Sequence, residues 1–231
     1  QAVRVVSPLA PELVQAQLEA VFEDVAVAAV KIGMVANAGI AEAIAEVLAR
    51  HRPPFVVFDP VMAASTNKRL MNESDLARIR TALLPQVSLL TPNLKEAARL
   101  LGIAQPVDEA GMRACLPALQ ALGVPNVLLK GGHLADDTPD ASESTDLLAT
   151  PEGVIRLSAP RIATRHGHGT GCTLSSAIAA LWPQHGLEKA TRMAKDYVHG
   201  ALLHADALQV GHGRGPLHHF WQAVHLPGQL A

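Results

Sequence analysis

Apolar residues along the chain recur in two alternating patterns, helical spacing and short continuous runs. Helical spacing predicts helices over residues 13–22, 40–48, 76–83, 108–122, 173–182 and 187–208, and a shorter one that ends near Gly102. The short apolar runs predict buried strands over residues 25–32, 55–58, 87–90 and 127–129. Residues 146–149 and 154–157 predict a hairpin at a sheet edge, and the polar segment 133–145 predicts an exposed, mobile loop.

Buried strands that alternate with amphipathic helices indicate an α/β fold. We expect an open, doubly wound, mostly parallel sheet flanked by helices in three layers, with a small hairpin at its edge. A length of 231 residues suits one domain, and no internal repeat or flexible linker divides the chain. Ligands bind beyond the carboxyl ends of the strands in such sheets, so the residues that follow each strand are the candidates for a functional site.

The composition narrows the classes of function. Apolar residues make up 49% of the chain and charged residues 17%, which is typical of a globular protein. A formal charge of −2 offers no basic surface for a nucleic acid or an anionic membrane. No segment approaches the roughly 20 apolar residues of a membrane-spanning helix. Two cysteines cannot form a disulfide framework in a chain of this size, so we expect a reducing compartment and a cytoplasmic protein.

A glycine-rich turn over residues 168–173 is the strongest chemical signal. Gly169 and Gly171 allow the backbone to approach a ligand closely, and the unpaired N–H groups of a helix start favour an anion. Together with Thr170 they predict an anion hole for a transferring phosphate. The spacing is not that of a Walker A loop, so a phosphate would be held by a different design. Taken alone, the pattern is equally that of an ordinary helix start.

Cys172 lies in the first turn of the helix that follows. The helix dipole and the adjacent N–H groups lower a thiol pKa there, which predicts a thiolate near pH 7. The alternative is a small buried apolar side chain, the usual state of a free cysteine. Cys115, within a helical pattern beside Leu116, keeps that second interpretation.

Two acidic residues follow separate strands. Asp59 directly follows an apolar strand, and Glu96 lies early in a helix that follows another. Two carboxylates at one edge of the sheet suit Mg²⁺, which needs few protein ligands because it keeps waters and substrate phosphates. We expect both at exposed ends of their elements. The alternative for Glu96 is a structural acid that interacts favourably with the helix dipole.

Two lysines are candidates for phosphate neutralisation. Lys130 ends a strand and is followed by Gly131 and Gly132, which would direct its ammonium toward the mouth of a cleft. Lys195 falls within a helical pattern, where a solvated lysine is the default expectation.

Five segments at strand ends and at the glycine-rich turn occur in one order along the chain. They are Lys31-Ile32-Gly33-Met34, Asp59-Pro60-Val61-Met62, Thr91-Pro92-Asn93 with Glu96-Ala97, Lys130-Gly131-Gly132-His133 and His168-Gly169-Thr170-Gly171-Cys172-Thr173. In this order they resemble the hydroxymethylpyrimidine and hydroxymethylpyrimidine-phosphate kinases of thiamine biosynthesis, a branch of the ribokinase-like superfamily. The similarity continues through residues 194–198 and 211–216, so it covers nearly the whole chain.

The resemblance implies an ATP-dependent kinase that phosphorylates hydroxymethylpyrimidine and then its monophosphate. It implies Mg²⁺ as cofactor, ATP as co-substrate and a homodimer. The residues from Gly169 to Cys172 would form the anion hole, with Cys172 where most of the superfamily has a catalytic aspartate. The other matching residues would be Asp59 and Glu96 for Mg²⁺, Lys130, Asn93, Glu96 and Lys195 for the nucleotide, and Gly33, Met34 and Val61 for the pyrimidine.

The chain departs from the family pattern at two places. His166-Gly167 stands where the family usually has Asn-Thr, next to the anion hole. The family also begins with a strand and a glycine-rich segment that contribute to the substrate pocket. About fifty such residues have no counterpart before Gln1, which no methionine precedes. Two alternatives therefore stay open: a pyridoxal kinase of the same superfamily, and a truncated pyrimidine-binding protein without catalysis.

Overall fold

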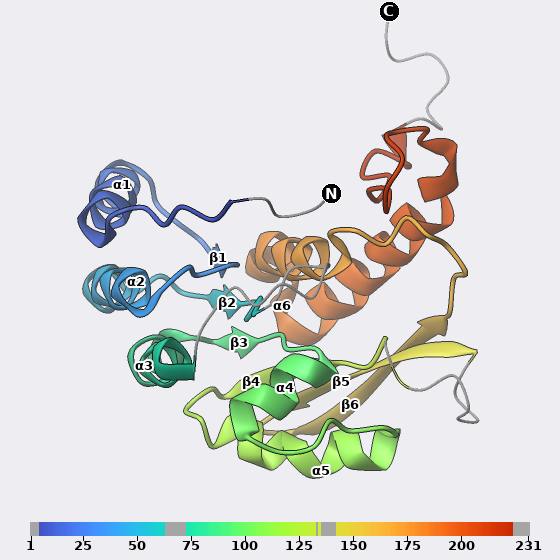
Figure 1. The fold of residues 1–231 in the computed structure, drawn as a ribbon, viewed down its shortest axis with the longest axis horizontal. Coiled ribbons are helices and arrows are strands. Elements are labelled where there is room, and N and C mark those ends of the chain that lie inside the picture. The colour runs from blue at the N-terminus through green and yellow to red at the C-terminus, as the bar shows by residue number, and fades with distance from the viewer. Residues whose placement is uncertain (1–4, 63–72, 133, 135–141, 224–231) are drawn as a thin grey trace, which may run out of the picture.

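The computed structural model describes residues 5–62, 73–132, 134 and 142–223, and the predicted alternation of helices and strands is present in it (Figure 1). The α-helices are α1 (Pro11–Asp24), α2 (Ala38–His51), α3 (Glu73–Leu83), α4 (Leu94–Leu101), α5 (Glu109–Gln120) and α6 (Thr170–Leu203). The strands are β1 (Val30–Ile32), β2 (Val56–Phe58), β3 (Leu89–Leu90), β4 (Asn126–Lys130), β5 (Glu143–Thr150) and β6 (Gly153–Pro160). Short 3₁₀ helices occupy Leu84–Gln86 and Ala205–Ala207.

The described strands form one mixed sheet in the order β1-β2-β3-β4-β5-β6. Strands β1 to β4 pair in parallel, and β5 and β6 add an antiparallel hairpin at the edge of β4. The predicted α/β class, the mostly parallel sheet and the edge hairpin are confirmed. β1 is shorter than predicted, because the expected strand at 25–32 pairs with β2 only over Val30–Ile32, whereas β4 extends one residue beyond each end of the expected 127–129.

The hairpin is longer than its apolar run indicated. Residues 143–145, expected in the exposed loop, belong to β5, and Thr145 is buried. Arg156 on β6 donates to the Glu143 carboxylate at 2.9 Å and to the Thr145 hydroxyl at 3.1 Å. Polar pairs across the hairpin thus extend it where apolar residues are lacking, a signal that hydrophobic periodicity cannot give. Most of the remaining predicted loop, including His133 and residues 135–141, lies outside the described residues.

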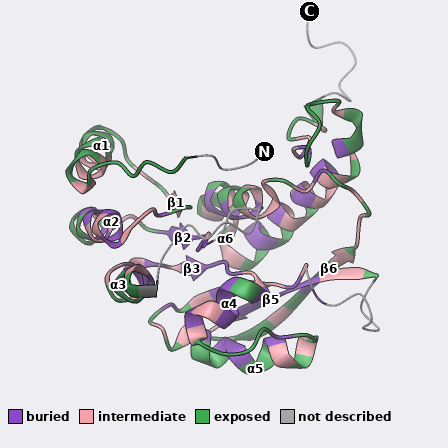
Figure 2. Cartoon of the chain, viewed as in Figure 1, coloured by how far each residue is buried: buried purple, intermediate pink, exposed green. Residues whose placement is uncertain are grey.

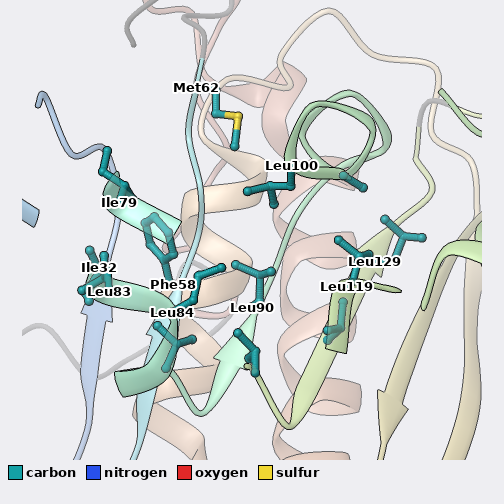
Figure 3. Close-up of a cluster of buried hydrophobic side chains, with 14 of the residues drawn as sticks. Ile32, Phe58, Met62, Ile79, Leu83, Leu84, Leu90, Leu100, Leu119 and Leu129 are labelled. Carbon is teal, nitrogen blue, oxygen red and sulfur yellow. The ribbon is translucent and has the colours of Figure 1, made fainter. Parts of the chain in front are cut away.

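Both faces of the parallel strands are covered. Val56 and Phe58 point into a core shared with α2, α3, α4 and α5, whereas Phe55 and Val57 point into a second core formed with α6. Figure 1 shows α1, α2 and α3 on one side of the strands and α6 on the other, and Figure 2 shows β2 and β3 buried between them. Figure 3 shows the first core, in which Phe58 and Leu90 lie among leucines from the helices. Two apolar faces explain why these strands are continuous apolar runs in the sequence.

Helix α6 covers most of the second face. The two helical patterns predicted after Cys172 form this one element, with a break at Gly186, whose φ of 70° and ψ of 175° are not helical. Pro183 precedes the break, and a positive φ is a conformation that glycine adopts without strain. The second pattern ends at Leu203 rather than at 208. In the described part of the chain no helix is both long and apolar enough to cross a membrane.

Candidate active site

The centre of the candidate site is a buried ion pair between two strand ends. Asp59 follows β2 and is only 2% exposed, and its Oδ1 accepts a hydrogen bond from Lys130 Nζ, at the end of β4, at 2.8 Å. The hydroxyl of Thr91, which follows β3, donates to the same oxygen at 3.3 Å. Three neighbouring strands therefore direct polar side chains to one point, as predicted for the carboxyl edge of the sheet. Asp59 is buried, contrary to the expectation of an exposed strand end.

The glycine-rich turn lies directly against this pair. A Cβ atom added at Gly171 would be 2.9 Å from Lys130 Nζ and 3.7 Å from Asp59 Oδ2. Glycine at 171 therefore permits the close approach of the helix to the pair. Gly169 is the N-cap of α6 with φ 88°, and no side chain caps the helix there. The first-turn N–H groups thus keep their capacity to bind an anion, beside a lysine ammonium.

Cys172 differs from the expectation in its protonation. The pKa of the Cys172 thiol is raised above the usual 9.0, mainly because the thiol loses contact with solvent. The charges of Lys31 and Lys130 lower this pKa, whereas the charge of Asp59 and a hydrogen bond to Asp59 raise it. The predicted thiolate at pH 7 is therefore wrong, because the partial desolvation of the thiol and the effect of Asp59 outweigh the cations. The alternative of a buried apolar cysteine is also wrong, since Cys172 is exposed. Cys115 is buried, as expected.

Asn93 and Glu96 form the start of α4. Asn93 Oδ1 accepts from the Glu96 N–H at 2.9 Å, and Glu96 Oε2 accepts from the Asn93 N–H at 2.7 Å, which is a capping box. The structural interpretation of Glu96 is thus confirmed. Its carboxyl also belongs to the site: burial raises the pKa of Glu96 to about 7, the charge of Lys130 and the Asn93 N–H lower it, and the charge of Asp59 raises it.

The two carboxylates fit a divalent cation. Asp59 and Glu96 are both buried, and the negative charge of one raises the pKa of the other. A divalent cation between them would relieve that repulsion, and Mg²⁺ accepts such hard oxygen ligands. No group of three or more His, Cys, Asp or Glu side chains that could hold a metal occurs among the described residues. A metal here would therefore depend on waters or substrate phosphates for its remaining ligands.

Lys195 lies beside the site in a second buried pair. Its Nζ donates to Asp146 Oδ2 at 2.6 Å and to the Ser144 carbonyl at 3.0 Å, so the expected solvated face is wrong. Asp146 Oδ1 also accepts from the N–H of Gly131, directly after Lys130. Sequence reasoning gave Asp146 no role. The signal was an acidic residue at the start of the apolar run 146–149, where a carboxylate needs a partner.

The three residues expected at the pyrimidine are not brought into one described cavity. Gly33 follows β1, Met34 is exposed, and Val61 is partly buried in a turn after Asp59. A cavity of about 850 Å³ opens beside Cys172 instead, lined by the α6 side chains Met193 and Tyr197 among others. The pyrimidine roles of Gly33, Met34 and Val61 stay predictions.

His166, which departs from the family pattern, fits into the structure because residue 215 is a glycine. His166 is buried, and an added Cβ at Gly215 would be 1.6 Å from its Nδ1. The N–H of His168 donates to the Gly215 carbonyl at 3.3 Å. The imidazole therefore occupies space that Gly215 leaves, and the C-terminal loop is tied to the segment before the anion hole.

A comparison with known protein families decides the assignment. The sequence profile described as phosphomethylpyrimidine kinase matches residues 1–218. The chain belongs to the phosphomethylpyrimidine kinase family. The resemblance, the ribokinase-like fold and the expected class of enzyme, a phosphotransferase, are confirmed.

Relatives of this kinase family are similar over most of their length. The hydroxymethylpyrimidine/phosphomethylpyrimidine kinase of Escherichia coli is 48% identical over 211 residues, which are 91% of this chain and 77% of the relative. The protein of the same name from Rhizobium meliloti is 45% identical over 219 residues, 94% of this chain and 80% of the relative.

Solved structures of related kinases have the same fold. Phosphomethylpyrimidine kinase from Clostridium difficile has a TM-score of 0.72 at 31% identity, over 87% of this chain and 80% of that structure. An ADP complex of Bacillus subtilis pyridoxal kinase has a TM-score of 0.84 at 26% identity, over 95% of this chain and 80% of that structure. Pyridoxal kinases are thus close in fold and more distant in sequence.

Proposed function

We propose that the protein is an ATP-dependent kinase that phosphorylates hydroxymethylpyrimidine and then its monophosphate, giving the diphosphate used in thiamine biosynthesis. The names of its relatives and its family support this function. One observation carries the chemistry: the Asp59–Lys130 pair lies against Gly171 in the first turn of α6. That arrangement places a cation and free backbone donors at one point, which phosphoryl transfer requires.

In the proposed reaction an oxygen of the acceptor attacks the γ-phosphorus of ATP while the bond to ADP breaks, and the proton of a hydroxyl acceptor passes to water. The N–H groups between Gly169 and Cys172 would bind the oxygens of the transferring phosphoryl group. Lys130 would neutralise its charge from the other side. Cys172, a protonated thiol at neutral pH, would contact the acceptor oxygen beside that group. Catalysis would come mainly from positioning and charge neutralisation.

The remaining residues would bind the metal and the nucleotide. Asp59 and Glu96 would hold Mg²⁺, which supplies charge neutralisation on the phosphates of ATP. Asn93, which begins α4, and Lys130 would lie toward the nucleotide, and an ATP-analogue complex of Staphylococcus aureus pyridoxal kinase supports a nucleotide in this fold. Lys195 would lie toward the nucleotide from α6, where its ammonium pairs with Asp146 of β5.

Further parts of the proposal concern the substrate and the assembly. Gly33, Met34 and Val61 would line the pyrimidine. A homodimer, a location in the cytoplasm and one domain over residues 1–231 also stay predictions. They rest on the resemblance and on the composition.

The direct test is turnover of both acceptors by the chain. With ATP and Mg²⁺, hydroxymethylpyrimidine should yield its monophosphate and then its diphosphate, which mass spectrometry distinguishes. A single phosphorylation would disprove the second step. No turnover of hydroxymethylpyrimidine or of pyridoxal would disprove the kinase function and favour a binding protein without catalysis.

Pyridoxal kinase activity is the second candidate, and the TM-score of 0.84 with a pyridoxal kinase favours it. Both acceptors are heteroaromatic alcohols, so they can compete for one site. An assay with both alcohols at equal concentration decides between them. We expect hydroxymethylpyrimidine to be preferred, because the relatives that carry its name are more similar in sequence.

A further inference from the structure

Lys31 places at the active edge of the sheet an ammonium that no described residue binds. It lies in β1, in register with Val57 of β2, and is partly buried. Its side chain folds forward along its own strand, so that Nζ would be 2.7 Å from a Cβ added at Gly33. The missing side chain at Gly33 therefore leaves room for the ammonium at the carboxyl end of β1, where ligands bind in this class of sheet.

The charge of Lys31 differs from those of the other two lysines at this edge. Lys130 and Lys195 each bind a buried aspartate, at 2.8 and 2.6 Å. Lys31 has neither a hydrogen-bond partner nor an ion pair within the part of the chain that the structure describes, residues 5–62, 73–132, 134 and 142–223. The described residues thus offer this partly buried ammonium no counter-ion, and a buried charge without one is costly, so binding of an anion beside it would be favourable.

The surroundings indicate where such an anion would lie. Helix α6 packs against β1, and the positive charge of Lys31 acts on Cys172, where it lowers the thiol pKa against the effect of burial. Cys172 is the proposed contact of the acceptor oxygen, and Gly33 is proposed to line the pyrimidine. The ammonium therefore lies beside Gly33, a predicted contact of the acceptor ring, and its charge reaches Cys172, the proposed contact of the acceptor oxygen.

The two proposed acceptors differ most in charge at that position. Hydroxymethylpyrimidine carries a neutral hydroxyl, whereas its monophosphate carries a charge of about −1.5 to −2 near pH 7. We propose that Lys31 binds the phosphate of the monophosphate acceptor and so determines its affinity in the second phosphorylation. This assignment rests on the proposed function and deepens it, because it gives one residue to the second acceptor alone.

The chemistry of the second step is consistent with this role. An oxygen of the acceptor phosphate attacks the γ-phosphorus, a P–O bond forms, the bond to the β–γ bridging oxygen breaks, and ADP leaves with the electron pair. The acceptor phosphate is largely ionised near pH 7, since its second pKa is about 6, and needs no base. Lys31 takes no part in the bond changes and supplies binding and orientation.

The test compares the two acceptors in Lys31→Met. KM for the monophosphate should rise about tenfold to hundredfold, the usual loss for a hydrogen bond to a charged group. KM for hydroxymethylpyrimidine should change little. Equilibrium titration of the monophosphate without ATP should show the same loss in Kd. Lys31→Arg, which keeps the charge, should restore much of the affinity, and Lys31→Gln provides a second neutral variant if the methionine variant folds poorly.

Lys189→Met is the matched control, because it removes the same charge from an exposed position of α6 and should change neither KM. Equal losses for both acceptors, or no loss for the monophosphate, would overturn the role of Lys31. Failure of the unmodified chain to phosphorylate either acceptor would overturn the proposed function instead. The two failures are thus distinguishable in one set of assays.

Discussion

The described residues contain two buried lysine–aspartate pairs, and the surroundings of the two pairs differ. The Asp59–Lys130 pair joins the ends of β2 and β4, and the Asp146–Lys195 pair joins β5 to α6. The side chains in both pairs are at most 14% exposed, and the N–O distances are 2.8 and 2.6 Å. Neither burial nor distance therefore separates a functional pair from a structural one.

The neighbours of each pair separate them. Gly171 and the uncapped start of α6 lie against Lys130, so this pair adjoins backbone donors that have no partner in the helix. The second pair is enclosed by polar groups that it satisfies: Lys195 also binds the Ser144 carbonyl, and Asp146 also binds the Gly131 N–H. A buried ion pair thus indicates a site only where groups beside it remain available to a ligand.

The largest effect is expected on stability, from Asp146→Asn. The amide can still accept from the Gly131 N–H, but the Lys195 ammonium becomes a buried charge without its counter-ion. We expect a loss of about 3–5 kcal/mol in the free energy of unfolding, measured by urea denaturation. Asp146→Asn combined with Lys195→Met removes both charges and should recover part of this loss. A loss below about 1 kcal/mol in the single variant would mean that water reaches the pair.

The second prediction concerns transfer rather than folding. Lys130→Met should lower kcat/KM for ATP by about 10²- to 10³-fold per folded molecule, because a cation at the transferring phosphate is lost. The fraction of folded protein is determined by circular dichroism before each assay. Asp146→Asn, assayed at a temperature where it is folded, should lose far less of its kcat/KM for ATP than Lys130→Met does. If both variants lose the same activity, the distinction between the two pairs fails.

The third prediction uses Glu96, which adds a carboxylate to the first pair only. Its pKa is about 7 in the folded protein against 4.5 ordinarily, so the folded state binds the proton more tightly. This stabilisation is complete below pH 4.5 and is lost as the pH rises to about 7. In Mg²⁺-free buffer, Glu96→Gln should remove about 3 kcal/mol of that pH dependence in the free energy of unfolding.

Glu188→Gln is the matched control for this measurement, because Glu188 is an exposed residue of α6 in an i,i+4 pair with Arg192. Its pH profile of stability should follow that of the unmodified chain. An unchanged profile in Glu96→Gln would show that Glu96 is as accessible to water as an ordinary surface acid.

The smallest effect is expected from Gly171→Ala. The added Cβ would be 2.9 Å from Lys130 Nζ, the flexible end of a long side chain, which can shift without unfolding the protein. We expect kcat/KM for ATP to fall about tenfold through displacement of that ammonium, with an unchanged midpoint of unfolding. Gly167→Ala, whose Cβ would have no neighbour closer than 3.7 Å, should leave the rate unchanged. Equal rates in both variants would contradict the contact.

Much of the fold could be predicted from the sequence, because helical spacing and short apolar runs, the two signals used, depend only on neighbouring residues. Apolar runs marked the parallel strands, since both of their faces are covered, and the strand ends gave the edge at which Asp59, Lys130 and the glycine-rich turn meet. Residues 143–145 were missed because their pairing depends on Arg156, a partner elsewhere in the sequence.

The electrostatics of the site could not be predicted in the same way. The helix dipole suggested a thiolate at Cys172, but loss of solvent raises the thiol pKa, and the charge of Asp59, more than a hundred residues earlier, raises it further. Lys195 looked solvated because its partner, Asp146, lies on another element. Residue type and local position predict which groups reach an edge; the charge that each group carries there depends on distant neighbours.

The position of α6 also determines the order in which the molecule can be completed during synthesis. Phe55, Val57, Leu89 and Leu128 face this helix, which begins only at Thr170. A nascent chain therefore presents an apolar sheet face to water until α6 has left the ribosome. Such a face is a binding surface for chaperones and a site of aggregation while translation continues. Slow translation before residue 170 should therefore lower the yield of folded protein more than slow translation after residue 203.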